Sequence, residues 1–171
     1  VVDADLGLRG GDLRAAERTY QLLSQATGRA GRADRPGRAI LQTWTPEHPV
    51  LQALAAGDRD AFVDAEMAER EAASLPPHGR LAALILSSEN AHAVEMLAAD
   101  LAAAIPNAGR LEVYGPADAP LALVRGRRRK RLLVRADRDV DLQGFLRAWL
   151  MRVKVPGSVR LSVDVDPYSF L

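Results

Sequence analysis

The segment Leu75-Pro76-Pro77-His78-Gly79 limits the fold of this chain more than any other feature, because it interrupts both helices and strands. Each proline lacks a backbone N–H group and has a fixed φ angle, and the glycine favours a turn. The 171 residues are therefore expected to form two parts, residues 1–74 and residues 80–171, with residues 75–79 as the linker. Since 48% of the residues are apolar, both parts can bury a core.

The first part combines short extended segments with helices. Residues 1–5 are predicted as the end of a buried strand, and residues 38–44 as a second strand. Between them, Asp12 can cap a helix over about residues 13–27, whose apolar positions recur every three or four residues. Two further helices are predicted over residues 50–55 and 59–73.

The second part shows the order strand, helix, strand, strand, helix, strand. Its second strand is expected in two pieces, residues 111–114 and 121–125, because Gly115-Pro116 interrupts it. This order is typical of an α+β domain with the ferredoxin-like arrangement. The other strands and helices are predicted over residues 81–87, 90–105, 131–136, 141–152 and 159–165.

Four aromatic side chains fall at apolar positions of these periodic patterns. Aromatic rings bury a large apolar area, so core packing is the favoured interpretation wherever they follow the apolar period. We therefore predict that all four lie in the core of their part rather than in a binding site. They are Trp44, Tyr114, Phe145 and Trp149.

Composition excludes several kinds of site. Cysteine is absent, which rules out disulfides, thiolate zinc sites and thiol catalysis within these residues. His48, His78 and His92 lack the spacing of a metal-ligand set, so no metal site is expected. No apolar run reaches the roughly 20 residues that cross a membrane, and no signal peptide is visible, so no membrane association and a cytoplasmic location are expected. Because Val1 already lies in an apolar run, we expect a fragment of a longer protein.

Positive charge is concentrated in one short segment of the second part. The net charge of +1 divides into −3 for residues 1–79 and +4 for residues 80–171, and six of the seven residues 125–131 are cations. On a hairpin, such a segment presents cations on both faces of the sheet, where they can neutralise phosphates. The alternative is a solvated hairpin tip that only blunts a sheet edge. The predicted DNA-binding residues are Arg125, Arg127, Arg128, Arg129, Lys130 and Arg131.

A second pattern, Gln25-Ala26-Thr27-Gly28-Arg29-Ala30-Gly31-Arg32, lies at the end of the first predicted helix. Each arginine follows a glycine, and glycines here end the helix and let the backbone come close to a ligand. Arginine suits a phosphate because its planar guanidinium donates two hydrogen bonds at once and stays charged. The alternative is a helix end that carries two solvated arginines.

This pattern is similar to motif six of superfamily 2 helicases, and the strings around it resemble the primosomal protein N′ (PriA) family of replication-restart DNA helicases. The resemblance implies that Gln25, Gly28, Arg29 and Arg32 bind ATP. It further implies that Arg29 and Arg32 are catalytic, with Arg32 as the arginine finger. The strings cover essentially the whole chain, and include Asp3-Ala4-Asp5, Gln21-Leu22-Leu23, Pro46-Glu47-His48-Pro49, Leu75-Pro76-Pro77, Arg125-Gly126-Arg127 and Asp164-Val165-Asp166-Pro167.

The resemblance also implies a fold and a role. Residues 1–74 would end the second RecA-like lobe of an α/β helicase, and residues 80–171 would form a C-terminal DNA-binding α+β domain. The implied activity is that of an ATP-dependent helicase that binds stalled or branched replication forks and starts primosome assembly. ATP, Mg²⁺ and a zinc module would belong to the intact protein, since this chain has no phosphate-binding loop and is expected to be inactive alone. The implied partners are branched or single-stranded DNA, replication-restart and helicase-loading proteins, and single-stranded DNA-binding protein.

Two other functions stay open at this point. One is a non-catalytic scaffold that binds forks and recruits primosome proteins without hydrolysing ATP. The other is an RNA-binding or ribosome-associated module, because the second part by itself offers only a common fold and a basic hairpin.

Overall fold

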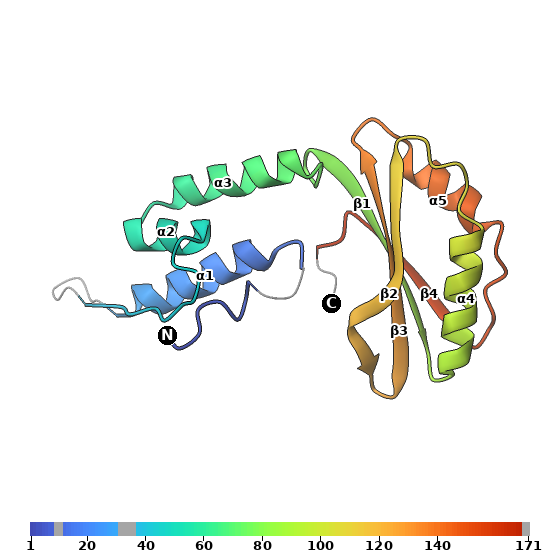
Figure 1. The fold of residues 1–171 in the computed structure, drawn as a ribbon, viewed down its shortest axis with the longest axis horizontal. Helices are drawn as coiled ribbons and strands as arrows, with labels where there is room; N and C mark the ends of the chain where they lie inside the picture. The colour runs from blue at the N-terminus through green and yellow to red at the C-terminus, as the bar shows by residue number, and fades with distance from the viewer. Residues whose placement is uncertain (9–11, 31–36, 169–171) are drawn as a thin grey trace. The chain divides into compact units, whose positions relative to one another are not determined.

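The computed structural model describes residues 1–8, 12–30 and 37–168 (Figure 1). The chain divides into two compact units, Val1–Glu69 and Arg70–Leu171, each with its own core. Each unit is described by itself below. None of the helices in the described ranges is long and apolar enough to span a membrane.

The first unit is built from helices, as predicted for much of its length. Helix α1 covers Ala15–Gly28, α2 covers Pro49–Ala56 and α3 covers Arg59–Ala72, of which residues 59–69 belong to this unit. Pro49 suits the first turn of α2 because its missing N–H group has no helical partner there. The core of this unit contains the buried Ala4, Leu23, Val50, Leu51, Ala53 and Phe62.

The two strands predicted in the first unit, residues 1–5 and 38–44, are not formed. The Val1 amino group donates to the Ile40 carbonyl oxygen at 2.8 Å, and the Gln42 N–H donates to the Val1 carbonyl at 3.0 Å. The pairing goes little further, because Asp3 has a φ of 57°, which turns the chain out of the extended conformation. The resemblance implies that residues 1–74 end a RecA-like lobe and contribute strands to its sheet. The described residues of this range form no strand, so the lobe is not present in them.

The second unit is an antiparallel α+β domain whose element order confirms the predicted β-α-β-β-α-β sequence. The four strands lie in the order β2-β3-β1-β4. Residues 75–78 form turns in which Leu75 accepts the N–H groups of His78 and Gly79. The elements are β1 (Gly79–Ser88), α4 (Ala91–Ala103), β2 (Leu111–Val124), β3 (Arg127–Asp137), α5 (Leu142–Leu150) and β4 (Arg160–Val165).

Helices α4 and α5 both pack against one face of this sheet (Figure 1). At the centre of the core, the fully buried Trp149 of α5 donates its indole N–H to the Leu101 carbonyl of α4 at 2.9 Å. Side chains alternate along a strand, so every second residue points to the opposite face, which we call the helix-free face. The strand residues that pack under the helices are Ala82, Leu84, Leu86, Leu132, Val134 and Ala136.

Strand β2 differs from its prediction as two separate pieces. It is one strand, Leu111–Val124, whose pairing with β3 shifts register after Tyr114 and again after Asp118. The predicted interruption at Gly115 is one of these bulges. Gly115 has a φ of 101°, and a Cβ atom there would lie 2.8 Å from the Arg131 carbonyl oxygen, so only glycine fits this bend.

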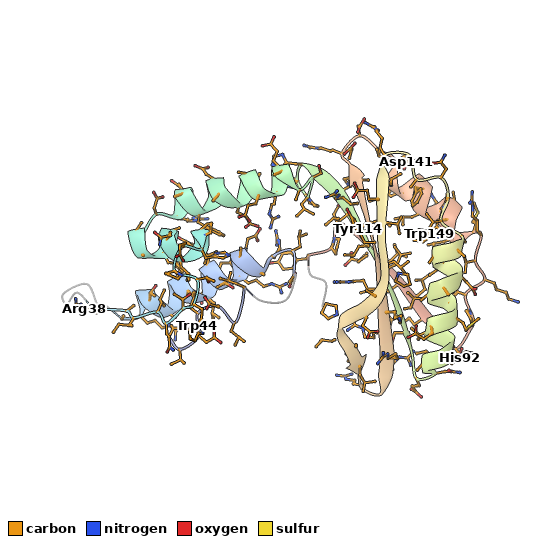
Figure 2. All side chains as sticks on the ribbon, in the orientation of Figure 1. Arg38, Trp44, His92, Tyr114, Asp141 and Trp149 are labelled. Atoms are coloured by element: carbon orange, nitrogen blue, oxygen red, sulfur yellow. The ribbon has the colours of Figure 1, made fainter. Side chains whose placement is uncertain are left out.

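Two of the four aromatic residues predicted as core are in the core, and two are not. Trp149 is buried, and Phe145 packs beside it. Trp44 is 83% exposed, because its segment is not a strand and its backbone N–H is held instead by the Asp5 carboxylate at 2.8 Å. Tyr114 is 47% exposed, because it follows Val113, which packs under the helices, and alternation turns Tyr114 to the helix-free face (Figure 2).

Candidate nucleic-acid interface

The basic segment 125–131 forms the turn and the first half of β3 in a hairpin with β2. Val124 pairs with Arg127, which leaves Arg125 and Gly126 as a two-residue loop. Their φ angles are 49° and 76°, and two successive positive values define the tight turn that suits the twist of a hairpin. The predicted hairpin is therefore formed, and Arg125 lies at its tip rather than in the second strand.

The register of the sheet separates the cations into two groups. Leu132 and Val134 lie under the helices. Because every second side chain of β3 points to the same face, Lys130 and Arg128 also lie on the helix-covered side. The residues that alternate with them, Arg127, Arg129 and Arg131, point to the helix-free face. We call these three side chains the arginine row.

The cations on the helix-covered side are paired with carboxylates of the domain itself. Lys130 Nζ lies 2.8 Å from Glu95 of α4, and the Lys130 side chain is only 17% exposed. Arg128 lies 3.3 Å from Asp118 of β2. Both carboxylates compete with any phosphate for these two cations, so this side is the weaker candidate for contact with DNA.

The side chains of the arginine row and of the hairpin tip differ in their contacts. Arg127 donates to the Ser87 hydroxyl and carbonyl oxygens, each at 3.1 Å, and lies 3.7 Å from Glu89. Partial burial lowers the pKa of the Arg131 guanidinium. Within the described ranges, Arg125 and Arg129 have neither an ion pair nor a side-chain hydrogen bond, so both can donate to a phosphate without first breaking a bond.

Beside the row lies a cluster formed by Glu112 and Tyr114 of β2 with Arg135 of β3. The Glu112 carboxylate accepts a hydrogen bond from the Tyr114 hydroxyl and lies 2.7 Å from the Arg135 guanidinium. The bond from Tyr114, with the charge of Arg135, lowers the pKa of Glu112. The same bond, with partial burial, raises the pKa of the Tyr114 hydroxyl. The sequence pattern predicts Tyr114 as a core residue. The signal against this prediction is that Tyr114 directly follows Val113, so that the two side chains point to opposite faces of the sheet.

The residues expected to face a nucleotide lie at the C-terminal end of α1. Gln25, Gly28 and Arg29 are all exposed, and α1 ends at Gly28 as predicted. A Cβ atom at Gly28 would meet nothing within 4 Å, so nothing in the described part of the chain approaches this glycine closely. Arg32 lies outside the described residues.

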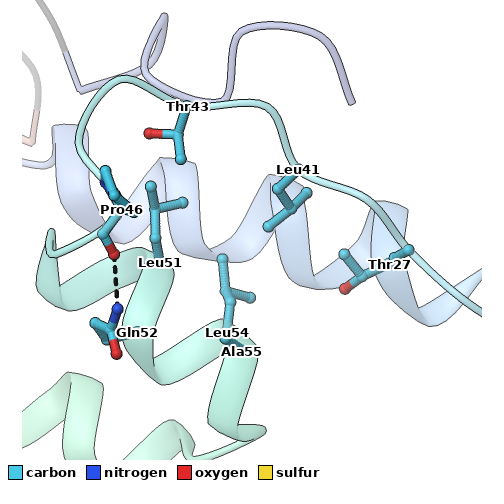
Figure 3. Close-up of a pocket in the computed structure, with 9 residues that line it drawn as sticks. Thr27, Leu41, Thr43, Pro46, Leu51, Gln52, Leu54 and Ala55 are labelled. Carbon is cyan, nitrogen blue, oxygen red and sulfur yellow. Dashed lines mark hydrogen bonds between the residues drawn. The ribbon is translucent and has the colours of Figure 1, made fainter.

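A pocket of about 410 Å³ lies in the first unit, close to this helix end (Figure 3). Thr27 of α1 lines one side, with Leu41, Leu51 and Leu54 among the apolar lining residues. The Gln52 amide nitrogen at its rim donates to the Pro46 carbonyl oxygen at 2.7 Å. Among the described residues that line this pocket none has a charged side chain, so these residues offer a phosphate no cationic partner. Across residues 1–8, 12–30 and 37–168, no group of three or more His, Asp or Glu side chains could hold a metal ion.

The second unit is thus a small α+β domain with a cationic hairpin whose tip is exposed. Residues 71–168 match the family described as primosomal protein N C-terminal domain. The chain therefore belongs to this family, which confirms the resemblance found in its sequence.

Relatives match the chain over nearly its whole length. It is 39% identical over 170 residues to the replication restart protein PriA of Rickettsia felis, with 99% of this chain and 26% of that protein covered. The protein of the same name from Synechocystis is 37% identical, with 99% and 20% covered, and that from Bacillus subtilis is 34% identical, with 100% and 22% covered. The chain thus spans between 20% and 26% of the length of these three relatives.

Proposed function

We propose that this chain is the DNA-binding C-terminal part of a replication-restart protein, and that its β2–β3 hairpin contacts the phosphates of branched DNA. The observation that carries the proposal is the arginine row, which places three cations on alternate residues of one strand, on the face opposite α4 and α5. Arg125 at the hairpin tip extends the same positive surface.

The arrangement suits contact with the DNA backbone rather than reading of bases. Guanidinium groups bind phosphate oxygens strongly, and such contacts position a protein on DNA without selecting a sequence. Alternate residues of a strand are about 7 Å apart, so the row forms a line that can follow a phosphate backbone. The ferredoxin-like arrangement supports this role because it leaves one face of the sheet free of helices.

For the intact protein, we propose an ATP-dependent DNA helicase that binds stalled forks and starts primosome assembly with helicase-loading proteins and single-stranded DNA-binding protein. Gln25, Gly28, Arg29 and Arg32 would contribute to a site for ATP and Mg²⁺ that the rest of the protein completes. The exposure of Arg29, which has no ion pair in the described part of the chain, supports this role. A zinc module of the intact protein would lie outside this chain.

The DNA-binding proposal is tested by fluorescence anisotropy with a labelled forked DNA. The double variant Arg125→Gln/Arg129→Gln removes two charges but keeps much of the side-chain stems. Its matched control, Arg147→Gln/Arg152→Gln, removes two exposed charges on and just after α5. We expect the hairpin variant to bind the fork roughly tenfold more weakly and the control to bind within about twofold of the native chain. Equal affinities of the two variants would refute the assignment of the interface to the hairpin.

The nucleotide proposal needs the intact protein. Arg32→Ala should lower the rate of DNA-stimulated ATP hydrolysis at least about a thousandfold if Arg32 is the arginine finger. Arg59→Ala removes an exposed arginine at the start of α3, without an ion pair in the described ranges, and should leave turnover unchanged. An unchanged rate in Arg32→Ala would exclude the finger role, and the absence of any ATP hydrolysis by the intact native protein would favour the scaffold.

A further inference from the structure

Tyr114 stands on the helix-free face as an exposed aromatic ring among arginines. It pairs with Leu133 of β3, so Arg131 and Arg135 lie two residues to either side of its partner. The residue is 47% exposed, whereas Leu81 and Ala83, on the same face of the central strand β1, are buried. The accessible part of this face is therefore the β2–β3 side, where the ring and the arginine row lie together.

The ring is held in place by its neighbours. Its hydroxyl donates to Glu112, and the same carboxylate binds Arg135, which also donates to the Ala73 carbonyl oxygen at 2.8 Å. The guanidinium carbon of Arg135 lies 5.8 Å from the ring centroid, within the range of a cation–π contact. A ring fixed in this way loses little further freedom when a flat partner stacks on its exposed surface.

The surroundings of Tyr114 select the kind of partner. An exposed aromatic ring alone would suit many apolar ligands, but here the row of cations beside it favours a polyanion. Single-stranded nucleic acid combines flat bases with phosphates, and base stacking on aromatic side chains is its usual mode of binding to sheets. A duplex keeps its base faces inside the stack, so it can use the arginines but not the ring.

We propose that an unpaired base of single-stranded DNA stacks on Tyr114 while neighbouring phosphates bind the arginine row. This inference rests on the proposed function, and it adds the class of DNA that the domain prefers. Arg131 lies about 7 Å along β3 from the residue opposite Tyr114, a distance that one extended nucleotide covers. The domain would thereby distinguish the single-stranded arm of a fork from its duplex arms.

Two substitutions separate the ring from the hydroxyl. Tyr114→Phe and Tyr114→Leu both lose the bond to Glu112, but only Tyr114→Phe keeps an aromatic ring. Each variant of the 171-residue chain is titrated with a fluorescein-labelled oligothymidine and with a blunt duplex of the same length. Circular dichroism melts of each variant identify the temperature range in which it is folded, and binding is measured within that range.

We expect Tyr114→Phe to bind the oligothymidine within about twofold of the native chain, and Tyr114→Leu to bind it roughly tenfold more weakly. Both should bind the duplex as the native chain does. Equal binding of the oligothymidine by all three proteins would overturn the stacking proposal and leave the phosphate interface standing. An equal loss for both DNAs in Tyr114→Leu would overturn it as well, because the ring would then act through the sheet. Failure of the native chain to bind either DNA would refute the proposed function itself.

Discussion

Lys130 Nζ lies 2.8 Å from a Glu95 carboxylate oxygen, and this ion pair joins β3 to α4 on the helix-covered side of the sheet. The neighbouring cation of β3, Arg129, points to the other face and has no ion pair in the described ranges. A run of like charges that looks uniform in the sequence is thus divided by the strand period into cations that the domain neutralises and cations that it leaves for a partner.

This division leads to a prediction about Glu95. Glu95→Gln removes the carboxylate that competes for Lys130, so the variant should bind forked DNA about two- to fivefold more tightly at low salt. Asp100→Asn is the matched control, since Asp100 is an exposed acid of the same helix without an ion pair in the described ranges. Anisotropy titrations of the two variants give the comparison. An equal gain in both would mean that only net charge matters and that Lys130 is not released.

The bend of β2 leads to a prediction about stability. Gly115→Ala introduces a Cβ atom 2.8 Å from the Arg131 carbonyl oxygen at a φ of 101°. It should therefore lower the free energy of unfolding by about 1–3 kcal/mol. Gly157→Ala is the control, because a Cβ there meets nothing within 4 Å. Urea unfolding followed by circular dichroism measures both. A Gly115→Ala variant as stable as the control would show that the bulge is not rigid.

The Glu112 cluster leads to a prediction about pH. The Tyr114 hydroxyl and the charge of Arg135 lower the pKa of Glu112 in the folded chain. Its carboxylate therefore stabilises the fold above the ordinary pKa of glutamate, about 4.3, and this stabilisation is lost as the pH falls through the lowered pKa. We expect the melting temperature of the native chain to exceed that of Glu112→Gln at neutral pH, and the difference to disappear in acid.

The control for this titration is Glu47→Gln, an exposed glutamate with no ion pair in the part of the chain described here. Its melting temperature should differ little from that of the native chain at every pH. A difference between native and Glu112→Gln chains that stays constant down to the most acid pH would contradict the assigned lowering of the Glu112 pKa.

Much of the second unit could be predicted from local sequence signals. Asn90 and Asp141 accept the backbone N–H groups of Ala93 and Gly144, and such caps mark where α4 and α5 begin. The hairpin was expected because a short basic segment containing Gly126 joins two strand-like runs. In these cases the residues that decide the structure lie within a few positions of one another.

The features that the sequence analysis did not predict depend on residues that are far apart in the sequence. Residues 38–44 have the composition of a strand, but a strand forms only where another pairs along it, and the extended pairing with Val1 is short. From the sequence alone, Tyr114 looks like a core residue. Only its pairing with Leu133 of β3 shows that it lies on the helix-free face. The pairing of Lys130 with Glu95 could not be predicted either, because these residues are brought together only when α4 packs on the sheet.

The salt dependence of fork binding tests the central claim most directly. If Arg125 and Arg129 each neutralise a phosphate, the plot of log K against log salt concentration should be shallower by about 1.4 to 1.8 for Arg125→Gln/Arg129→Gln than for the native chain. The Arg147→Gln/Arg152→Gln control should keep the native slope. Parallel lines for the native chain and the hairpin variant would contradict the account, because the hairpin arginines would then release no counterions on binding.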